Sequence, residues 1–278
     1  MYNLAQLFRP ITAKPENTET YIEILPCDIL KPYVRCFWGS PQPKRKFWQE
    51  NFKSHSTIII PDTCMDIIFE IDYLSNEVSS VFCGINDTSF SDFRSNKTAV
   101  VSTFGIRFHF WAVHLFADIC MREVLNVFTD VEEYFGDFKK ALENILMEKT
   151  TMEEKIPEVE KYLMNRLNIN RRTNDDVMNA VYYILKAKGI ISIAELCKSV
   201  AISQRQLERL FLEYIGVSPK KTADLVRFQN VWQDMYYSKT FDFQDVVFKY
   251  KYSDQSHFVN DFKKYAGRTP LEALIYAK

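Results

Sequence analysis

Hydrophobic and polar residues follow one pattern in the first part of this 278-residue chain and another pattern after it. Between residues 21 and 110, short runs rich in β-branched and aromatic residues are separated by turn formers such as Pro61-Asp62. The runs with strand character are residues 21–25, 57–60, 65–71, 81–83 and 99–108. Short strands with frequent turns are typical of an antiparallel sheet or a barrel. We therefore expect a β-rich first domain.

After Trp111 the pattern becomes helical, because apolar residues recur at three- and four-residue spacing. This spacing predicts helices over residues 111–127, 131–147 and 152–167. Residues 168–174 are polar and rich in turn formers, which is typical of a linker. We expect a β-rich sensor or dimerisation domain with a helical C-terminal part at residues 1–167. An all-α domain should follow at residues 175–278.

The last hundred residues contain an internal repeat. Five positions of the first copy recur 51 residues later with the same character. The matched residues are Leu207, Phe211, Tyr214, Gly216 and Pro219, then Phe258, Phe262, Tyr265, Gly267 and Pro270. Upstream, Ile193, Leu196 and Cys197 match Phe243, Val246 and Val247 at an offset of 50 residues, so the second copy has one more residue in its central turn.

Each copy predicts a short helix, a tight turn and a second helix that ends at glycine and proline. The predicted helices are residues 192–200 and 204–215 in the first copy, and 242–250 and 255–266 in the second. Ser203 and Asp254 precede the second helices as good N-caps. Glycine accepts left-handed backbone angles, and proline cannot continue a helix. This is the helix-turn-helix arrangement, whose second helix enters the DNA major groove.

The second helix of the first copy has an apolar face and a polar face. Leu207, Leu210, Phe211 and Tyr214 lie at the spacing of a core stripe. Arginine pairs with guanine and glutamate with cytosine, so the polar face is suited to reading base edges. The candidate DNA-binding residues there are Gln204, Arg205, Gln206, Glu208 and Arg209. The alternative is a solvated charged face; the repeat favours the DNA-binding interpretation.

The second copy and the segment between the copies supply further candidates. Glutamine and asparagine pair with adenine, which points to the outward positions of the second recognition helix, Gln255, Ser256, His257 and Asn260. Residues 219–238 predict one helix about 30 Å long. Successive major grooves on one side of DNA are about 34 Å apart. Lys220 and Lys221 in its first turn are candidates for phosphate contacts or are simply solvated.

Charge and cysteine content narrow the classes of function. Residues 180–278 hold 15 basic and 10 acidic residues, whereas the first 179 residues hold 20 basic and 26 acidic ones. The part of the chain with the repeat is therefore the basic part, which suits a nucleic-acid partner. No secretory signal or membrane-spanning run is apparent. The cysteines are scattered without zinc-type spacing, so we expect reduced thiols in a cytoplasmic protein with no metal or cofactor. They are Cys27, Cys36, Cys64, Cys83, Cys120 and Cys197.

The C-terminal motifs resemble the DNA-binding domain of AraC/XylS-type bacterial regulators. The resemblance covers residues 175–278 and rests on 203–211, 216–219, Arg227-Phe228, 252–258, 261–263 and 267–270. It implies a transcription regulator, with double-stranded DNA, RNA polymerase and a second copy of the chain as partners, and favours an activator. The sequence itself does not say whether transcription is raised or lowered. Lys251 stands where the family usually has glycine, which predicts a strained or shifted turn. Asn260 replaces a frequent arginine, which predicts weaker reading by the second unit.

The first domain resembles, more loosely, the uncharacterised sensor-like domains attached to some of these regulators. The motifs are residues 21–26, 30–38, 61–69 and 104–108. The predicted fold is thus α+β, a cupin-like barrel or sheet followed by two helix-turn-helix units joined by a long helix. A small-molecule effector is implied, but the residues that follow, His109 to Val113, depart from the relatives' pattern. Four aromatic residues either line a ligand pocket or pack in the core: Trp38, Phe47, Trp48 and Trp111.

Two other classes of protein remain open. One is an enzyme fused to the DNA reader, either a zinc-dependent repair methyl-transfer domain or a catalytic barrel. Neither is favoured, because the cysteines lack paired spacing and His55, His109 and His114 lack the His-x-His pattern of metal-binding barrels. The other is an interaction module whose first domain only dimerises, through an apolar face between Trp111 and Met147.

Overall fold

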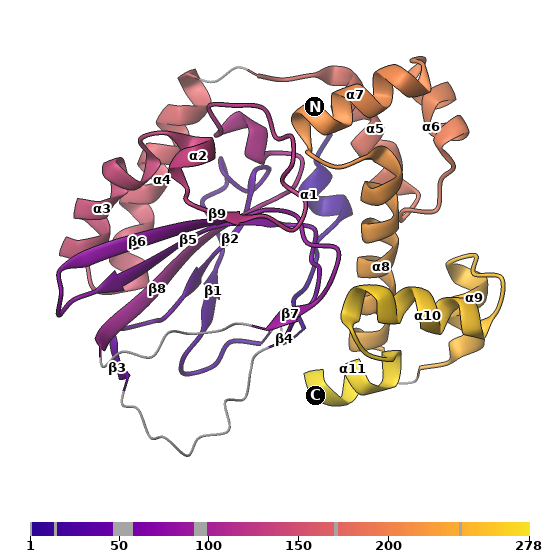
Figure 1. Ribbon diagram of the computed structural model, residues 1–278. Coiled ribbons are helices and arrows are strands. Elements are labelled where there is room, and N and C mark those ends of the chain that lie inside the picture. Colours follow the sequence, from indigo (N-terminus) through magenta and orange to yellow (C-terminus); the bar gives the residue numbers. More distant parts are fainter. Residues whose placement is uncertain (1, 14–15, 47–57, 92–98, 170–171, 239–240) are drawn as a thin grey trace.

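An antiparallel sheet forms the first part of the chain and helices form the rest, which confirms the predicted α+β class (Figure 1). The computed structural model describes residues 2–13, 16–46, 58–91, 99–169, 172–238 and 241–278. The strands are β1 Ile22–Ile24, β2 Val34–Gly39, β3 Lys44–Lys46, β4 Ile58–Ile59, β5 Met65–Asp72, β6 Glu77–Cys83, β7 Phe90–Ser91, β8 Ala99–Phe108 and β9 Phe128–Thr129.

Seven of these strands form one sheet in the order β1-β2-β8-β5-β6-β9, with β3 also beside β8, and β4 pairs with β7. Within the described residues the sheet is open, with β1 and β9 at its ends, so it is a sheet rather than a closed barrel. The two central strands are held in register by apolar pairs, Ile67 opposite Ile106 and Phe69 opposite Phe104. All four side chains are fully buried, which fixes the register because a one-residue slip would expose them.

Several predicted strands agree with the structure, and others were missed. Strands β1, β5 and β8 coincide with the predicted runs, and β6 begins four residues earlier than predicted. The run at residues 57–60 corresponds to β4, with Thr57 outside the described residues. Strands β2, β3, β7 and β9 were not predicted. Three of them are only two or three residues long, too short for a recognisable alternation.

The helix predicted over residues 111–127 is wrong. The segment holds only a three-residue 3-10 helix at Val113–Leu115, followed by turns with positive φ at Glu123 and Asn126. Every residue from Phe110 to Ala117 is buried. The apolar spacing there reflects a segment enclosed on all sides rather than one face of an amphipathic helix.

The helices between residues 132 and 169 lie along one face of the sheet (Figure 1). The helix predicted over residues 131–147 is two helices, α2 Glu132–Phe135 and α3 Phe138–Glu148, because Gly136 between them has a φ of +48° that ends the first. The third prediction is confirmed as α4 Met152–Ile169. A short helix, α1 Leu4–Leu7, precedes the sheet.

The C-terminal region is all helical, as predicted. Its helices begin and end within one residue of the predicted positions in both copies of the repeat. They are α5 Asp175–Lys186, α6 Ile193–Val200, α7 Gln204–Tyr214, α8 Pro219–Tyr237, α9 Phe243–Lys249, α10 Gln255–Ala266 and α11 Pro270–Ala277. Among the described residues, no helix combines the length and the apolar character that crossing a membrane requires.

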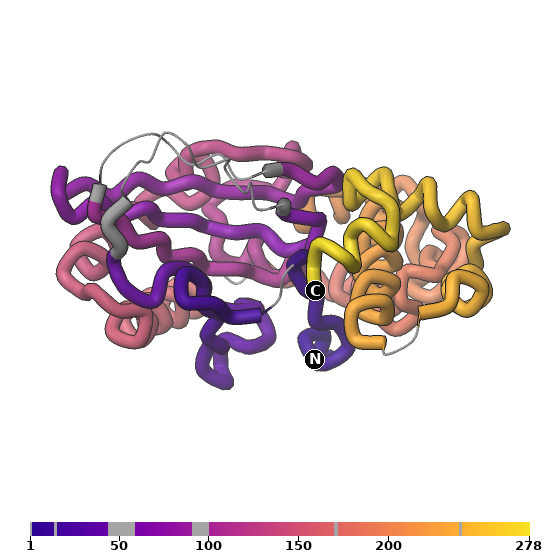
Figure 2. The backbone as a smooth tube through the Cα atoms, turned by 90° about the horizontal axis from the view of Figure 1, so that it is seen from below, coloured from indigo at the N-terminus to yellow at the C-terminus, as the bar shows by residue number. Residues whose placement is uncertain are grey.

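The N-terminal segment lies at the junction between the sheet and the helical domain (Figure 2). Gln229 of α8 is fully buried, and its amide bonds the backbone of Ile11 in both directions, at 2.9 and 3.1 Å, and the Pro61 carbonyl at 2.7 Å. Trp232, one turn further along α8, donates to the carbonyl of Thr12 at 3.1 Å. The long helix between the two helix-turn-helix units therefore also carries the contact with the first domain.

Candidate nucleic-acid interface

The first helix-turn-helix unit consists of α6, a three-residue turn and α7. Ser192 and Glu195 form a capping box that starts α6, and the Ser203 hydroxyl accepts from the Gln206 amide to start α7. Between them Ala201 has a φ of +56°, and the Ile202 amide donates to the Cys197 carbonyl at 3.3 Å. This six-to-one bond is the Schellman ending of α6, and it sets the direction in which α7 leaves.

The second unit, α9 and α10, repeats this construction with the extra turn residue that the sequence predicts. Lys251 has a φ of +52°, and the Tyr252 amide donates to the Val247 carbonyl at 3.0 Å, matching Ala201 and Ile202. The position that usually holds glycine therefore keeps its left-handed backbone with a lysine on it. The predicted strain is present and the turn is not shifted. Asp254 caps α10 by accepting from the His257 amide at 2.8 Å.

The predicted core faces of both recognition helices are buried. Leu207, Leu210 and Phe211 of α7 are at most 5% exposed. In α10, Phe258 and Phe262 stand in the places of Leu207 and Phe211, and Phe262 packs on both Phe228 and Trp232 of α8. Asp261 stands in the place of Leu210 and pairs with Arg227 at 2.9 Å. With one face of each helix fixed against the core, the opposite face is directed outward.

The candidate reading residues of α7 all lie on its exposed face. The five are Gln204, Arg205, Gln206, Glu208 and Arg209. The Gln204 amide donates to the Glu208 carboxylate at 2.8 Å, and Arg209 pairs with Glu213 at 3.3 Å. Both are exposed i,i+4 contacts, which are weak and easily exchanged for a base edge. The structure thus leaves this face free for DNA, and the base contacts themselves stay a prediction.

The candidate residues of α10 are also exposed: Gln255, Ser256, His257 and Asn260. The His257 ring lies 3.0 Å from the Ser253 hydroxyl, so its Nδ1 is occupied within the turn. Unlike the α7 candidates, none of these four is an arginine, a lysine or a carboxylate. The amide groups can pair with adenine, whereas a hydroxyl group accepts several different bases.

The two lysines at the start of α8 differ in their partners. Lys220 is exposed and pairs with Asp224 one turn along, at 2.7 Å. Lys221 is part-buried, and its Nζ lies 2.5 Å from Asp87 of the first domain. A phosphate contact by Lys221 therefore requires separation from Asp87, whereas Lys220 needs no rearrangement of the first domain.

The first domain rests directly on the first helix-turn-helix unit. The Met121 amide donates to the Glu213 carbonyl of α7 at 2.9 Å. The His114 ring meets the Tyr214 ring edge to face, with centroids 5.2 Å apart. A Cβ added to Gly216, after α7, would lie 2.2 Å from the Met121 carbonyl oxygen, so only glycine fits this approach. These contacts connect the two domains at the end of a recognition helix.

The motifs of the first domain converge on one buried ion cluster around Arg107. Its Nε lies 3.0 Å from Asp66 and 3.5 Å from Asp62, and its Nη1 lies 3.4 Å from Glu23. The Trp38 indole also donates to Asp66, at 2.7 Å. Burial raises the pKa of Asp66, and Arg107 and Trp38 oppose that shift by stabilising the carboxylate. Each of four sequence motifs thus supplies part of one charge network.

Lys249 and Phe248, next to the second turn, were not among the predicted candidates. Lys249, Lys251 and the 89%-exposed Phe248 line a shallow surface depression with Gln255, the first residue of α10. Lysines beside the start of a recognition helix are suited to phosphate contacts. Their position in the repeat, before the second recognition helix, is the signal that could have identified them.

The other predicted residues fall in different places. Trp111 lines a cavity, Trp38 belongs to the Arg107 cluster, and Phe47, Trp48 and His55 lie outside the described residues. His109 and His114 are buried, with burial lowering their pKa to about 3 and about 4. In the described part of the chain no three His, Cys, Asp or Glu side chains gather as metal ligands would.

Two family models match this chain. One, described as a helix-turn-helix domain, covers residues 196–274, and the other, described as a domain of unknown function (DUF6597), covers residues 22–130. No curated protein matches.

Among solved structures, the chain is similar to ToxT from Vibrio cholerae. The wild-type protein of strain SCE256 with an unsaturated fatty acid bound is 13% identical, with a TM-score of 0.42 over 95% of this chain and 98% of that one. ToxT of strain O395 is 13% identical, with a TM-score of 0.42 over 87% of this chain and 98% of that one.

The helix-turn-helix match begins in α6 and ends in α11, and so spans both copies of the repeat. Two such units, joined by one helix and each presenting an exposed polar face, form the arrangement that the motifs predict. Through this domain the chain is a DNA-binding transcription regulator, and the matched region is the one that resembles the AraC/XylS type.

Proposed function

We propose that α7 and α10 read two successive major grooves of one operator, and that α7 contributes more of the sequence discrimination. The observation that carries this is the exposed face of α7, where Arg205 and Arg209 stand beside Glu208. Bidentate arginine–guanine pairs discriminate by about 1–3 kcal/mol each. The four candidate positions of α10 offer amide, hydroxyl and imidazole groups, among them Asn260, and the exposed lysines of this helix, Lys263 and Lys264, lie in its last turn.

The length of α8 supports the two-groove arrangement. Its 19 residues span about 28 Å at 1.5 Å per residue. Adjacent grooves on one face of DNA are about 34 Å apart. Lys220, in the first turn of this helix, lies between α7 and α10 in the sequence. In this arrangement it would contact a phosphate of the DNA backbone between the two grooves.

We further propose that the first domain controls DNA binding and carries out no catalysis. Its contacts at Glu213 and Tyr214 lie at the C-terminal end of α7, so any change in how the domains dock changes where α7 points. The Arg107 cluster is occupied by its own carboxylates, as a structural network would be. Regulation in the cytoplasm, through an effector and RNA polymerase, is the expected setting.

Dimerisation through the first domain is part of the same proposal. The segment between Trp111 and Met147 presents Ile119, Leu125 and Phe128 as exposed apolar side chains, although not on the helix first expected. Light scattering of the full chain at micromolar concentration tests this proposal. A wild-type dimer that becomes a monomer in the Phe128→Asp variant supports it, and a wild-type monomer contradicts it.

The reading role of α7 is tested by selecting bound fragments from random DNA with the full chain, then measuring variants on the selected site by fluorescence anisotropy. Arg209→Ala should lose about 1–3 kcal/mol and accept any base at one position. Lys161→Ala, which removes an equally exposed charge from α4, is the matched control and should leave binding unchanged. Unchanged affinity and unchanged specificity of Arg205→Ala and Arg209→Ala would overturn the assignment.

A further inference from the structure

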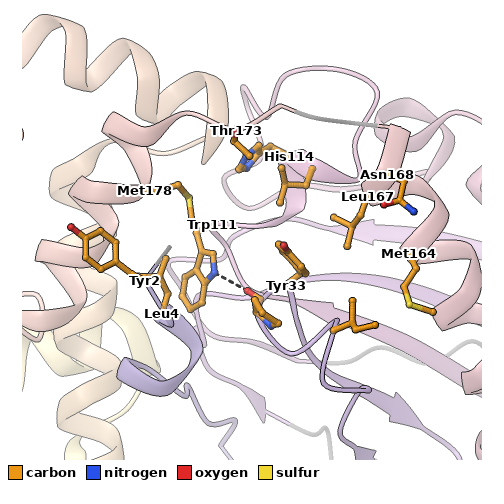
Figure 3. Close-up of a pocket in the computed structure, with 13 residues that line it drawn as sticks. Tyr2, Leu4, Tyr33, Trp111, His114, Met164, Leu167, Asn168, Thr173 and Met178 are labelled. Atoms are coloured by element: carbon orange, nitrogen blue, oxygen red, sulfur yellow. Dashed lines mark hydrogen bonds between the residues drawn. The ribbon is translucent and has the colours of Figure 1, made fainter.

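A cavity of about 560 Å³ lies where the two domains and the linker meet (Figure 3). It is bounded by Tyr2 and Leu4 of the N-terminal segment, Trp111 of the first domain, Leu167 of α4 and Met178 of α5. Its size is within the range of small-molecule sites in proteins. Because its walls come from both sides of the junction, an occupant would contact both domains.

The lining is apolar apart from a few groups that form hydrogen bonds. The polar side chains are those of His114, Asn168 and Thr173, together with two tyrosines, and no described lining residue carries a full charge. The Trp111 indole already donates to the Pro32 carbonyl at 3.1 Å (Figure 3). A ligand therefore meets a mostly hydrophobic wall with few points of polar recognition.

His114 is the polar lining group with an unpaired nitrogen, and its ring also interacts with the backbone of Arg172. It is 4% exposed, and its Nδ1 is buried without a hydrogen-bond partner in the described part of the chain. Buried polar atoms in native proteins are nearly always paired, so an unpaired one beside a cavity indicates a missing partner. Burial also lowers the pKa of His114 to about 4, and the neutral ring offers a hydrogen bond rather than a charge.

These features select the chemistry of the occupant. An ionised carboxylate would lose its hydration here without meeting a cation among the described lining residues, which is unfavourable. The guanidinium of Arg172, whose charge acts on His114, already donates to the Asp118 carbonyl at 2.9 Å. A hydroxyl or phenol keeps its hydrogen bond through His114 and buries the rest of the molecule against Trp111, Leu167 and Met178. The cavity thus favours neutral amphiphiles over anions.

We propose that this cavity binds a small, uncharged, largely apolar alcohol or phenol that pairs with His114, and that binding alters the seating of α7. The route to α7 is short, because the His114 ring also packs edge to face on Tyr214, the last residue of that helix. The binding step stands by itself, whereas the effect on DNA rests on the proposed function.

Binding is tested by titration calorimetry of the full chain with three probes of one shape: 4-phenylphenol, biphenyl and biphenyl-4-carboxylate. We expect saturable binding of 4-phenylphenol at one site, with both other probes at least tenfold weaker. Met164→Trp should fill the cavity and abolish binding, whereas Leu74→Trp, at a 66%-exposed hairpin position, should leave it intact. Absence of saturable 4-phenylphenol binding, or equal binding by Met164→Trp, overturns the proposal.

Two further variants separate recognition from its consequence. In His114→Leu the preference for 4-phenylphenol over biphenyl should fall to less than threefold; an unchanged preference overturns the role of His114. In Tyr214→Leu the probe should still bind but no longer shift the affinity for the selected DNA, a shift that we expect to be at least threefold in the wild type. Probe binding without that shift overturns the coupling alone. Failure of the chain to bind DNA at all, with probe binding intact, overturns the proposed function instead.

Discussion

The two helix-turn-helix units have nearly the same backbone and different surroundings. In both, a Schellman turn with a non-glycine residue at positive φ, Ala201 or Lys251, leads into a helix capped by Ser203 or Asp254. The first unit ends against the first domain through Glu213 and Tyr214. The four candidate positions of α10 carry no arginine or carboxylate, and the exposed lysines of α10 lie in its last turn.

The difference indicates that duplication preserved the scaffold and divided the work. Hydrophobic burial and capping keep a recognition helix in place regardless of what its outer face carries. The outer face and the far end of the helix are therefore free to change. On the proposed function, the first unit combines arginine-based reading with attachment to the first domain, and the second supplies a more permissive contact.

The largest expected effect concerns the attachment of the first unit. His114 has a pKa of about 4 in the folded protein against about 6.5 when unfolded, so only the unfolded state takes up its proton between these values. The stabilising contribution is complete above pH 6.5 and is lost as the pH falls towards 4, at a cost of roughly 3 kcal/mol. Urea unfolding of wild type and His114→Leu at pH 7 and pH 4.5 checks this. Between pH 7 and pH 4.5 the unfolding free energy of the wild type should fall by more than that of His114→Leu. An equal fall in both proteins contradicts the prediction.

The next effect compares the reading faces directly. Arg209→Ala should weaken binding to the selected DNA by about 1–3 kcal/mol, whereas Asn260→Ala should cost less than about 1 kcal/mol. Anisotropy titrations at one fixed salt concentration measure both. An Asn260→Ala loss equal to or larger than that of Arg209→Ala would show that the second unit reads DNA at least as strongly, contrary to the proposed division.

The C-terminal domain could be predicted closely because its signals are local. Caps such as Ser203 and Asp254, the glycines that end the recognition helices and the 3.6-residue periodicity each act within a few residues. The tertiary core did not override them. For the same reason the exposed positions of α7 and α10 follow from the repeat alone.

The first domain was harder because its signals are long-range. The enclosed segment from Phe110 to Ala117 has helical spacing without a helix, since it packs on all sides. The Arg107 cluster unites residues from four distant motifs, and Gln229 reaches residues 218 positions away. No local pattern reports such contacts. The cavity beside His114 was equally invisible, because it exists only once the domains are docked.

A smaller effect is expected where α8 follows the first unit. Lys220→Ala should remove one phosphate contact and reduce the slope of log affinity against log salt by about 1. Asp87→Asn should free Lys221 from its ion pair and tighten DNA binding by up to about 1 kcal/mol. Titrations at several salt concentrations measure both, with Lys161→Ala as the control. Weaker DNA binding by Asp87→Asn would mean that the ion pair supports the DNA-binding conformation rather than competing with DNA.

The smallest effect concerns the turns that the two units share. A non-glycine residue at positive φ costs roughly 1 kcal/mol, partly offset by the greater entropy that glycine has in the unfolded chain. Lys251→Gly and Ala201→Gly should therefore each stabilise the protein by a few tenths to about 1 kcal/mol. Lys249→Gly, two residues earlier at the last position of α9, is the control and should destabilise the protein, because it gains backbone freedom in the unfolded chain and loses the ion pair with Asp234. Thermal unfolding measures all three. If Lys251→Gly lowers stability while Ala201→Gly raises it, the lysine side chain stabilises its turn by more than the backbone strain costs, and the two turns are not equivalent.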